Sequence, residues 1–136
     1  MQFFLANNVQ KGDRIAGICP NNISAITVML AASAIGAIWS SCSPDFGDTG
    51  ICDRFGQINP TCIVSVPSYM YKNKIIDMSA RLATIQAQLP NVPLWVNCTH
   101  DPLPNFIPLA NVQKAIPEPI SFEPCNFNDP LFILFS

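Results

Sequence analysis

Short, almost wholly apolar runs alternate along the chain with longer segments in which apolar residues recur every three or four positions. An apolar run of about four to eight residues is typical of a strand buried on both faces, and a spacing of three to four is typical of a helix. Strands are therefore predicted over residues 14–19, 37–41, 61–66, 93–98 and 131–136. Helices are predicted over residues 22–36, 50–58 and 75–89, with the tail of another over residues 1–8.

The helix predicted over residues 22–36 is apolar nearly all round. Asn21 or Asn22 is suited to cap its start. Ile23, Ile26, Leu30 and Ala34 recur at helical spacing, with Met29 beside them. Gly36 closes the helix after roughly 15 residues, fewer than the ~20 that a membrane span needs. A core helix packed on several sides is predicted in preference to a span.

Two segments interrupt this pattern. Residues 67–74, "PSYMYKNK", are predicted to form a loop. Residues 100–128 carry six prolines, and a long surface loop is predicted there, with one short helical piece near residues 109–115. The remaining alternation of strands and helices predicts an α/β fold, a parallel sheet with helices on both faces. Residues 1–136 are assigned to one incomplete domain.

In such sheets ligands bind at the carboxyl ends of the strands. Three predicted loops lie there, at residues 20–22, 42–47 and 67–74. The last run, "LFILFS", is expected to be a central strand that would itself be followed by a ligand-binding loop. The chain is therefore expected to be part of a longer one; the alternative is an edge strand that ends at Ser136.

The composition indicates that part of the surface of this chain is buried against other protein. Hydrophobic residues make up 49% of the chain and charged residues 12%, against about 25% charged in an average globular protein. So little polar surface predicts contact with a partner or with more chain, and self-association of the isolated piece. The net charge of −2 and the lack of a basic block argue against nucleic-acid binding.

The six cysteines contain no C-x-x-C pair, and the chain has one histidine, so a zinc site is not predicted. An even cysteine count also fits disulfides in a secreted protein, but "MQFFLANN" lacks the basic start and cleavage site of a signal peptide. Reduced, buried thiols and a cytoplasmic location are therefore favoured.

Four stretches, taken in order, resemble the N-terminal domain of the acyl-adenylate-forming enzymes, which include the acyl-CoA synthetases. They are "KGDRIAGICPNN", "GAIWSSCSPDFG", "DRFGQINP" and "DPLFILFS". Within that family, "IWSSCSPDFG" with "DRFGQI" is more similar to the enzymes that activate acetoacetate than to those that activate acetate. The resemblance implies that acetoacetate, or a similar short acid, reacts with ATP and Mg²⁺ to give an acyl-adenylate, from which CoA takes the acyl group.

The resemblance also implies binding residues. The segment with Ser43 and Phe46 lies along the CoA channel in related ligases. Tyr71 and Lys74 match arginines that lie near the CoA 3′-phosphate in acetyl-CoA synthetases. Lys74 keeps the charge, and Tyr71 is suited to stack on adenine. Ser136 stands at or just before the loop that holds the ATP phosphates.

No catalytic and no metal-binding residue is assigned to this chain. The adenine-binding segment, the ribose-binding aspartate, the hinge and the catalytic lysine of the family all lie further along, so the chain alone is expected to be inactive. Plainer interpretations stay open: Pro44-Asp45 as an ordinary turn, Lys74 as a solvated lysine, and the whole chain as a non-catalytic α/β module that binds a nucleotide, CoA or a partner chain.

Overall fold

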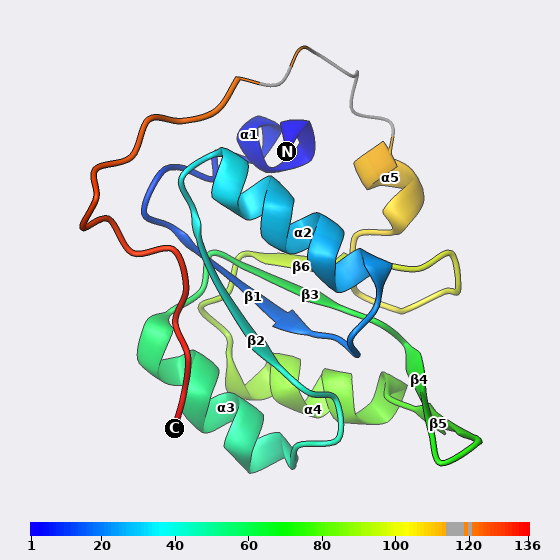
Figure 1. Cartoon of the computed structure of the whole chain (residues 1–136). Coiled ribbons are helices and arrows are strands. Elements are labelled where there is room, and N and C mark those ends of the chain that lie inside the picture. The colour runs from blue at the N-terminus through cyan, green and yellow to red at the C-terminus, as the bar shows by residue number, and fades with distance from the viewer. Residues whose placement is uncertain (114–118, 120) are drawn as a thin grey trace.

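The computed structural model describes residues 1–113, 119 and 121–136 and places a sheet between two layers of helices (Figure 1). The elements in chain order are α1 (Gln2–Ala6), β1 (Arg14–Ile18), α2 (Ile23–Ala34), β2 (Ile38–Cys42), α3 (Asp48–Ile58), β3 (Cys62–Ser65), β4 (Ser68–Tyr71), β5 (Lys74–Asp77), α4 (Ser79–Gln88), β6 (Leu94–Asn97) and α5 (Leu109–Gln113).

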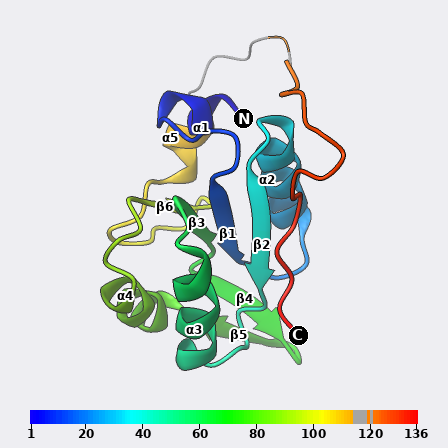
Figure 2. The ribbon, with the colours of Figure 1, turned by 90° about the vertical axis from the view of Figure 1, so that its left-hand side faces the viewer.

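The main sheet has four parallel strands in the order β2-β1-β3-β6. Successive side chains of a strand point to opposite faces. Ile15 and Trp39 therefore join the core beneath α1, α2 and α5, whereas Ala16, Ile18 and Ile63 join the core that α3 and α4 cover. Figure 2 shows α2 on one side of the sheet and α3 and α4 on the other. The predicted parallel sheet with helices on both faces is confirmed.

Helix α2 begins where the sequence predicts. The Asn22 side chain, in extended backbone, accepts a hydrogen bond of 3.1 Å from the backbone N–H of Ala25. The expected packing of this helix on several sides is not found, however. Ile23, Ile26 and Leu30 are 83%, 55% and 59% exposed, and the buried side of the helix is built around Ala32. Small side chains let the helix lie close to the sheet, and an all-apolar helix carries no pattern that tells its inner face from its outer one.

Residues 67–74 are not the predicted loop. Strands β4 and β5 pair in an antiparallel hairpin, with Met70 opposite Ile75. Lys72 and Asn73 take positive φ values of 47° and 60°, as the two central residues of a type I′ hairpin turn must. Helix α4 consequently starts at Ser79 rather than at Ile75, and Leu82 and Ile85 on it are buried, as is Met78 just before it.

Within this chain the final apolar run lies at the edge of the sheet and not in its centre, where it was predicted. Residues 131–136 are extended beside β2 at the margin of the sheet, with one parallel bridge between Trp39 and Phe132. Trp39 donates its backbone N–H to Leu131, and Ile133 donates to Trp39 at 2.9 Å. Among the described residues no strand pairs with the outer side of this segment.

The described part of the proline-rich segment is mostly irregular, as predicted, but it is not all at the surface, because Leu103 and Phe106 are buried. The short helix expected near residues 109–115 is present as α5 as far as Gln113; residues 114–118 and 120 lie outside the described part. All six cysteines are free. Four are buried as predicted, and burial raises the pKa of the Cys62 thiol, whereas Cys125 is exposed. In the described part of the chain no helix is both long and apolar enough for a membrane span.

Gly17 in β1 is fixed by close packing. A Cβ at this position would lie 2.5 Å from the indole of Trp39, which is itself buried. We expect Gly17→Ala to destabilise the fold by about 1–3 kcal/mol, because the indole must move within a packed core. Gly56→Ala is the matched control: its Cβ meets only Leu89 at 4.0 Å, and alanine favours the helix by about 0.5–1 kcal/mol. Urea melts of the two variants should shift in opposite directions; a Gly17→Ala midpoint at or above wild type contradicts this packing.

The exposed apolar face of α2 predicts self-association of the isolated chain. Replacing Ile23, Ile26 and Leu30 by glutamine should raise the monomer fraction in light scattering without loss of the fold, because none of the three side chains is buried. A wild-type chain that stays monomeric at tens of micromolar, with one cooperative melt, contradicts this expectation.

Candidate functional site

A cleft of about 280 Å³ opens at the carboxyl ends of β1 and β2, beside the β4–β5 hairpin. Residues 19–21 line it after β1, residues 41–45 at and beyond the end of β2, and residues 69–71 from β4. All three segments that sequence analysis places at the ligand-binding edge therefore contribute to one site, because parallel strands end at the same edge of the sheet.

The structure brings two of the candidate CoA residues, Ser43 and Tyr71, to the wall of this cleft. Ser43 donates its hydroxyl to the carboxylate of Asp45, which also lines the cleft. Lys74 does not line it: it lies on β5 directly opposite Tyr71, at the end of the hairpin. The neighbouring Lys72 holds its ammonium 5.4 Å from the centre of the Tyr71 ring, so two cations and one aromatic ring share this tip.

Phe46 and Ser136, the other two candidates, lie outside the cleft lining. The Phe46 ring is 41% exposed and sits 4.9 Å from the guanidinium carbon of Arg54 on α3. The same guanidinium lies 6.0 Å from the ring of Phe135, the residue before Ser136. Arg54 thus links the loop after β2 to the terminal segment. Whether Ser136 meets ATP stays a prediction.

Sequence analysis missed Arg81 on α4, which holds the loop after β2 in place. Its Nε donates to Asp48 Oδ1 at 2.7 Å, its Nη1 donates to the carbonyl of Pro44 at 2.9 Å, and its Nη2 donates to the carbonyl of Phe46. No sequence pattern marks this residue, because its partners lie 33 to 37 positions away along the chain.

The described lining of the cleft offers hydroxyl, amide and aromatic groups that can bind a ligand. The described residues contain no group of three or more histidine, cysteine, aspartate or glutamate side chains that suits a metal ion. Burial raises the pKa of the Cys42 thiol, and the nearby Arg54 opposes this only in part. Cys42 is therefore held as a neutral thiol, not as an activated nucleophile.

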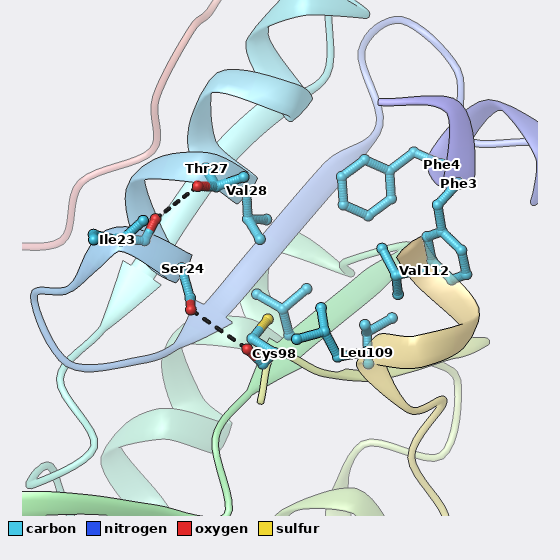
Figure 3. Close-up of a pocket in the computed structure, with 11 residues that line it drawn as sticks. Phe3, Phe4, Ile23, Ser24, Thr27, Val28, Cys98, Leu109 and Val112 are labelled. Atoms are coloured by element: carbon cyan, nitrogen blue, oxygen red, sulfur yellow. Dashed lines mark hydrogen bonds between the residues drawn. The ribbon is translucent and has the colours of Figure 1, made fainter. Parts of the chain in front are cut away.

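A second hollow, of about 230 Å³, lies on the opposite side of β3 and β6 from α4, between α1, α2 and α5 (Figure 3). Phe3, Phe4 and Val112 surround it, and the hydroxyls at its wall are turned to the backbone. Ser24 donates to the carbonyl of Cys98 and Thr27 to that of Ile23. Among the described residues no charged side chain lines this hollow, so that part of its wall does not suit a phosphate or a carboxylate.

An α/β domain with a ligand cleft at the carboxyl ends of parallel strands is the arrangement used by many nucleotide-binding enzymes. The chain belongs to one such family. The family model described as "AMP-binding enzyme" matches residues 2–136.

Two relatives and one solved structure show what the chain is similar to. It is 39% identical over 141 residues to acetoacetyl-CoA synthetase of Mus musculus, and this match covers 94% of the chain and 21% of that protein. It is 37% identical over 147 residues to acetoacetyl-coenzyme A synthetase of Rhizobium meliloti, over 99% of the chain and 22% of that protein. The solved structure of acetoacetyl-CoA synthetase from Streptomyces lividans superposes with a TM-score of 0.90 at 31% identity, over 98% of the chain and 21% of that structure. The chain spans about a fifth of the length of these relatives.

Proposed function

We propose that this chain is part of an acid–thiol ligase that converts acetoacetate, ATP and CoA into acetoacetyl-CoA, AMP and pyrophosphate. The observation that carries the proposal is the match to acetoacetyl-CoA synthetases along almost the whole chain, at 37–39% identity in two of them. Mg²⁺ enters the proposal as the ion that accompanies the ATP phosphates, with no side chain of this chain assigned to it.

Within that reaction we assign the cleft to CoA. Its walls offer a hydroxyl and an aromatic ring, Ser43 and Tyr71, and the hairpin adds the cations Lys72 and Lys74 beside the ring. A base that stacks on a ring, with its phosphate paired to a lysine, is a standard way to hold a nucleotide. Phe46 is proposed to line the path to the rest of the CoA molecule, and Ser136 to adjoin the ATP phosphates.

The roles of the remaining parts follow from this assignment. Acetoacetate, ATP and CoA are the proposed partners, together with the rest of a longer chain that would supply the catalytic lysine and the phosphate loop. This chain alone is proposed to be inactive. The free state of all six thiols fits the proposed cytoplasmic location.

A non-catalytic α/β module that binds a nucleotide or CoA is the second candidate. The cleft favours it in one respect, because its described lining offers a hydroxyl and aromatic rings that can bind a ligand. Activity in the setting of a complete ligase separates the two candidates.

The ligase proposal predicts the behaviour of a chimera in which this chain replaces the matching fifth of the Streptomyces lividans acetoacetyl-CoA synthetase. The chimera should catalyse ATP–pyrophosphate exchange that depends on acetoacetate, whereas the chain alone should show none. A folded chimera without exchange contradicts the ligase proposal, and exchange by the chain alone contradicts its proposed inactivity.

The CoA assignment predicts that removal of the Lys74 charge weakens the binding of CoA. Lys74→Ala should weaken CoA binding about fivefold, as expected for one exposed ion pair worth about 1 kcal/mol. The same variant should bind 3′-dephospho-CoA as wild type does, because the phosphate that Lys74 pairs with is absent. Equilibrium dialysis of the chain at micromolar concentration measures both dissociation constants.

Lys11→Ala is the matched control, because Lys11 pairs with Asp129 at 3.0 Å in the turn before β1, at the amino end of the sheet. It should leave both dissociation constants unchanged. Equal weakening of CoA and 3′-dephospho-CoA by Lys74→Ala would show that the lysine does not recognise the 3′-phosphate.

A further inference from the structure

We propose that Arg81 is a positioning residue that joins the two walls of the cleft, the loop of residues 43–47 and the β4–β5 hairpin. The part of this inference that concerns CoA rests on the proposed function. The part that concerns the loop stands on the contacts of the side chain alone.

All three nitrogens of the Arg81 guanidinium group donate hydrogen bonds to the loop after β2 or to the first residue of α3. Nε pairs with Asp48 at 2.7 Å in the first turn of α3, Nη1 bonds the Pro44 carbonyl at 2.9 Å, and Nη2 bonds the Phe46 carbonyl. A planar, five-donor fork can hold a carboxylate and two carbonyls in fixed relative positions, which a single ammonium group cannot. About 30% of each side chain of the ion pair is exposed, so the pair is partly shielded from water.

Among the described residues, the other contacts of the loop are few. The Phe46 N–H bonds the Ser43 carbonyl at 3.1 Å and closes a single turn, the Ser43 hydroxyl bonds Asp45, and the Gly47 carbonyl accepts the Ile51 N–H at 3.1 Å. In a trans peptide the N–H of the next residue points opposite to the carbonyl. By taking the carbonyls of Pro44 and Phe46, Arg81 therefore turns the N–H groups of Asp45 and Gly47 away from itself. It sets the orientation of two of the four peptide units that link residues 43–47.

The helix that carries Arg81 is also bonded to the β4–β5 hairpin, the other wall of the cleft. Helix α4, which carries Arg81, follows β5 directly: Asp77 Oδ1 accepts the Ser79 N–H at 2.7 Å, and the Met78 N–H bonds the Pro67 carbonyl at 2.7 Å, across the base of the hairpin. Met78 is fully buried and also contacts Arg81, with 3.3 Å between its sulfur and Nη1. The start of α4 is thus anchored to the hairpin on one side and to the loop on the other. Arg81 is the link that sets the distance between Ser43 and Tyr71 across the cleft.

Arg14 provides a matched control at the opposite end of the sheet. Its guanidinium also bonds three carbonyls, those of Ile58, Gly12 and Asn59, at 2.8, 3.1 and 2.9 Å. It stands at the start of β1, whereas the cleft lies at the other end of that strand. Arg14→Lys therefore removes a similar set of bonds without touching the cleft.

Two identical Phe-Gly bonds allow a local test of the loop. Phe46–Gly47 lies in the loop, and Phe55–Gly56 lies in α3 with the Phe55 side chain fully buried. In Arg81→Lys we expect chymotrypsin to cut Phe46–Gly47 about tenfold faster while the rate at Phe55–Gly56 stays unchanged, because local opening precedes cleavage. In Arg14→Lys the ratio of the two rates should equal that of wild type. The measurement is mass spectrometry of the fragments at micromolar protein.

The second readout is the dissociation constant for CoA. Arg81→Lys should raise it about fivefold to tenfold, since a mobile wall must be ordered on binding, and Arg14→Lys should leave it unchanged. A merely structural role for Arg81 would instead raise both cleavage rates together and would lower the melting temperature without this selectivity.

Each outcome decides a separate claim. An unchanged ratio of cleavage rates in Arg81→Lys overturns the positioning role, whether or not CoA binds. A changed ratio with an unchanged CoA dissociation constant overturns the link between the loop and the ligand. A wild-type chain that binds no CoA contradicts the proposed CoA site, and the cleavage ratio then still decides the positioning of the loop.

Discussion

Burial of both faces of the parallel sheet is the constraint on which the rest of the structure depends. Each strand sends alternate side chains into two separate cores, one under α1, α2 and α5 and one under α3 and α4. With helices on both faces, the polar groups that can meet a charged ligand lie at the ends of the sheet, because the hollow on one face is lined mainly by apolar side chains. The loops that follow β1 and β2 meet at one of those ends, and the cleft is formed there with the help of the hairpin.

Arginines at the two ends of the sheet bond backbone carbonyls in the segments that connect strands and helices, which strand pairing does not reach. Arg14 fixes carbonyls at the end of α3, and Arg81 fixes carbonyls in the loop that precedes it. Buried strands pair with one another, but the loops between strands and helices leave backbone oxygens without partners. A long, planar cation satisfies several of them at once. The loop that is proposed to contact CoA is thereby part of the rigid framework.

The apolar residues of α2 are exposed and the chain has few charged residues. Both features agree with the finding that the chain matches only about a fifth of the length of its relatives. The chain matches about a fifth of relatives that are named as acetoacetyl-CoA synthetases, and its outer α2 face carries side chains of the kind that interiors bury. The helical pattern does not tell which side of α2 faces the sheet: with apolar residues all round, the size of the side chains decided which side approached the sheet, and the smaller ones fit.

The sequence by itself determined the alternation of strands and helices outside the hairpin, the parallel sheet, a helix cap at Asn21 or Asn22, and the three segments that meet at the ligand edge, because these follow from local periodicity and chain connectivity. Only the tertiary structure decided the rest. Residues 67–74 belong to a hairpin whose turn needs two positive φ angles, and the sequence has no Asn-Gly pair there to predict them. The terminal run lies along β2 at the margin of the sheet. The tertiary structure also brought Arg81 to a loop more than 30 residues away, because contacts between distant segments depend on how layers pack and leave no mark in the local pattern.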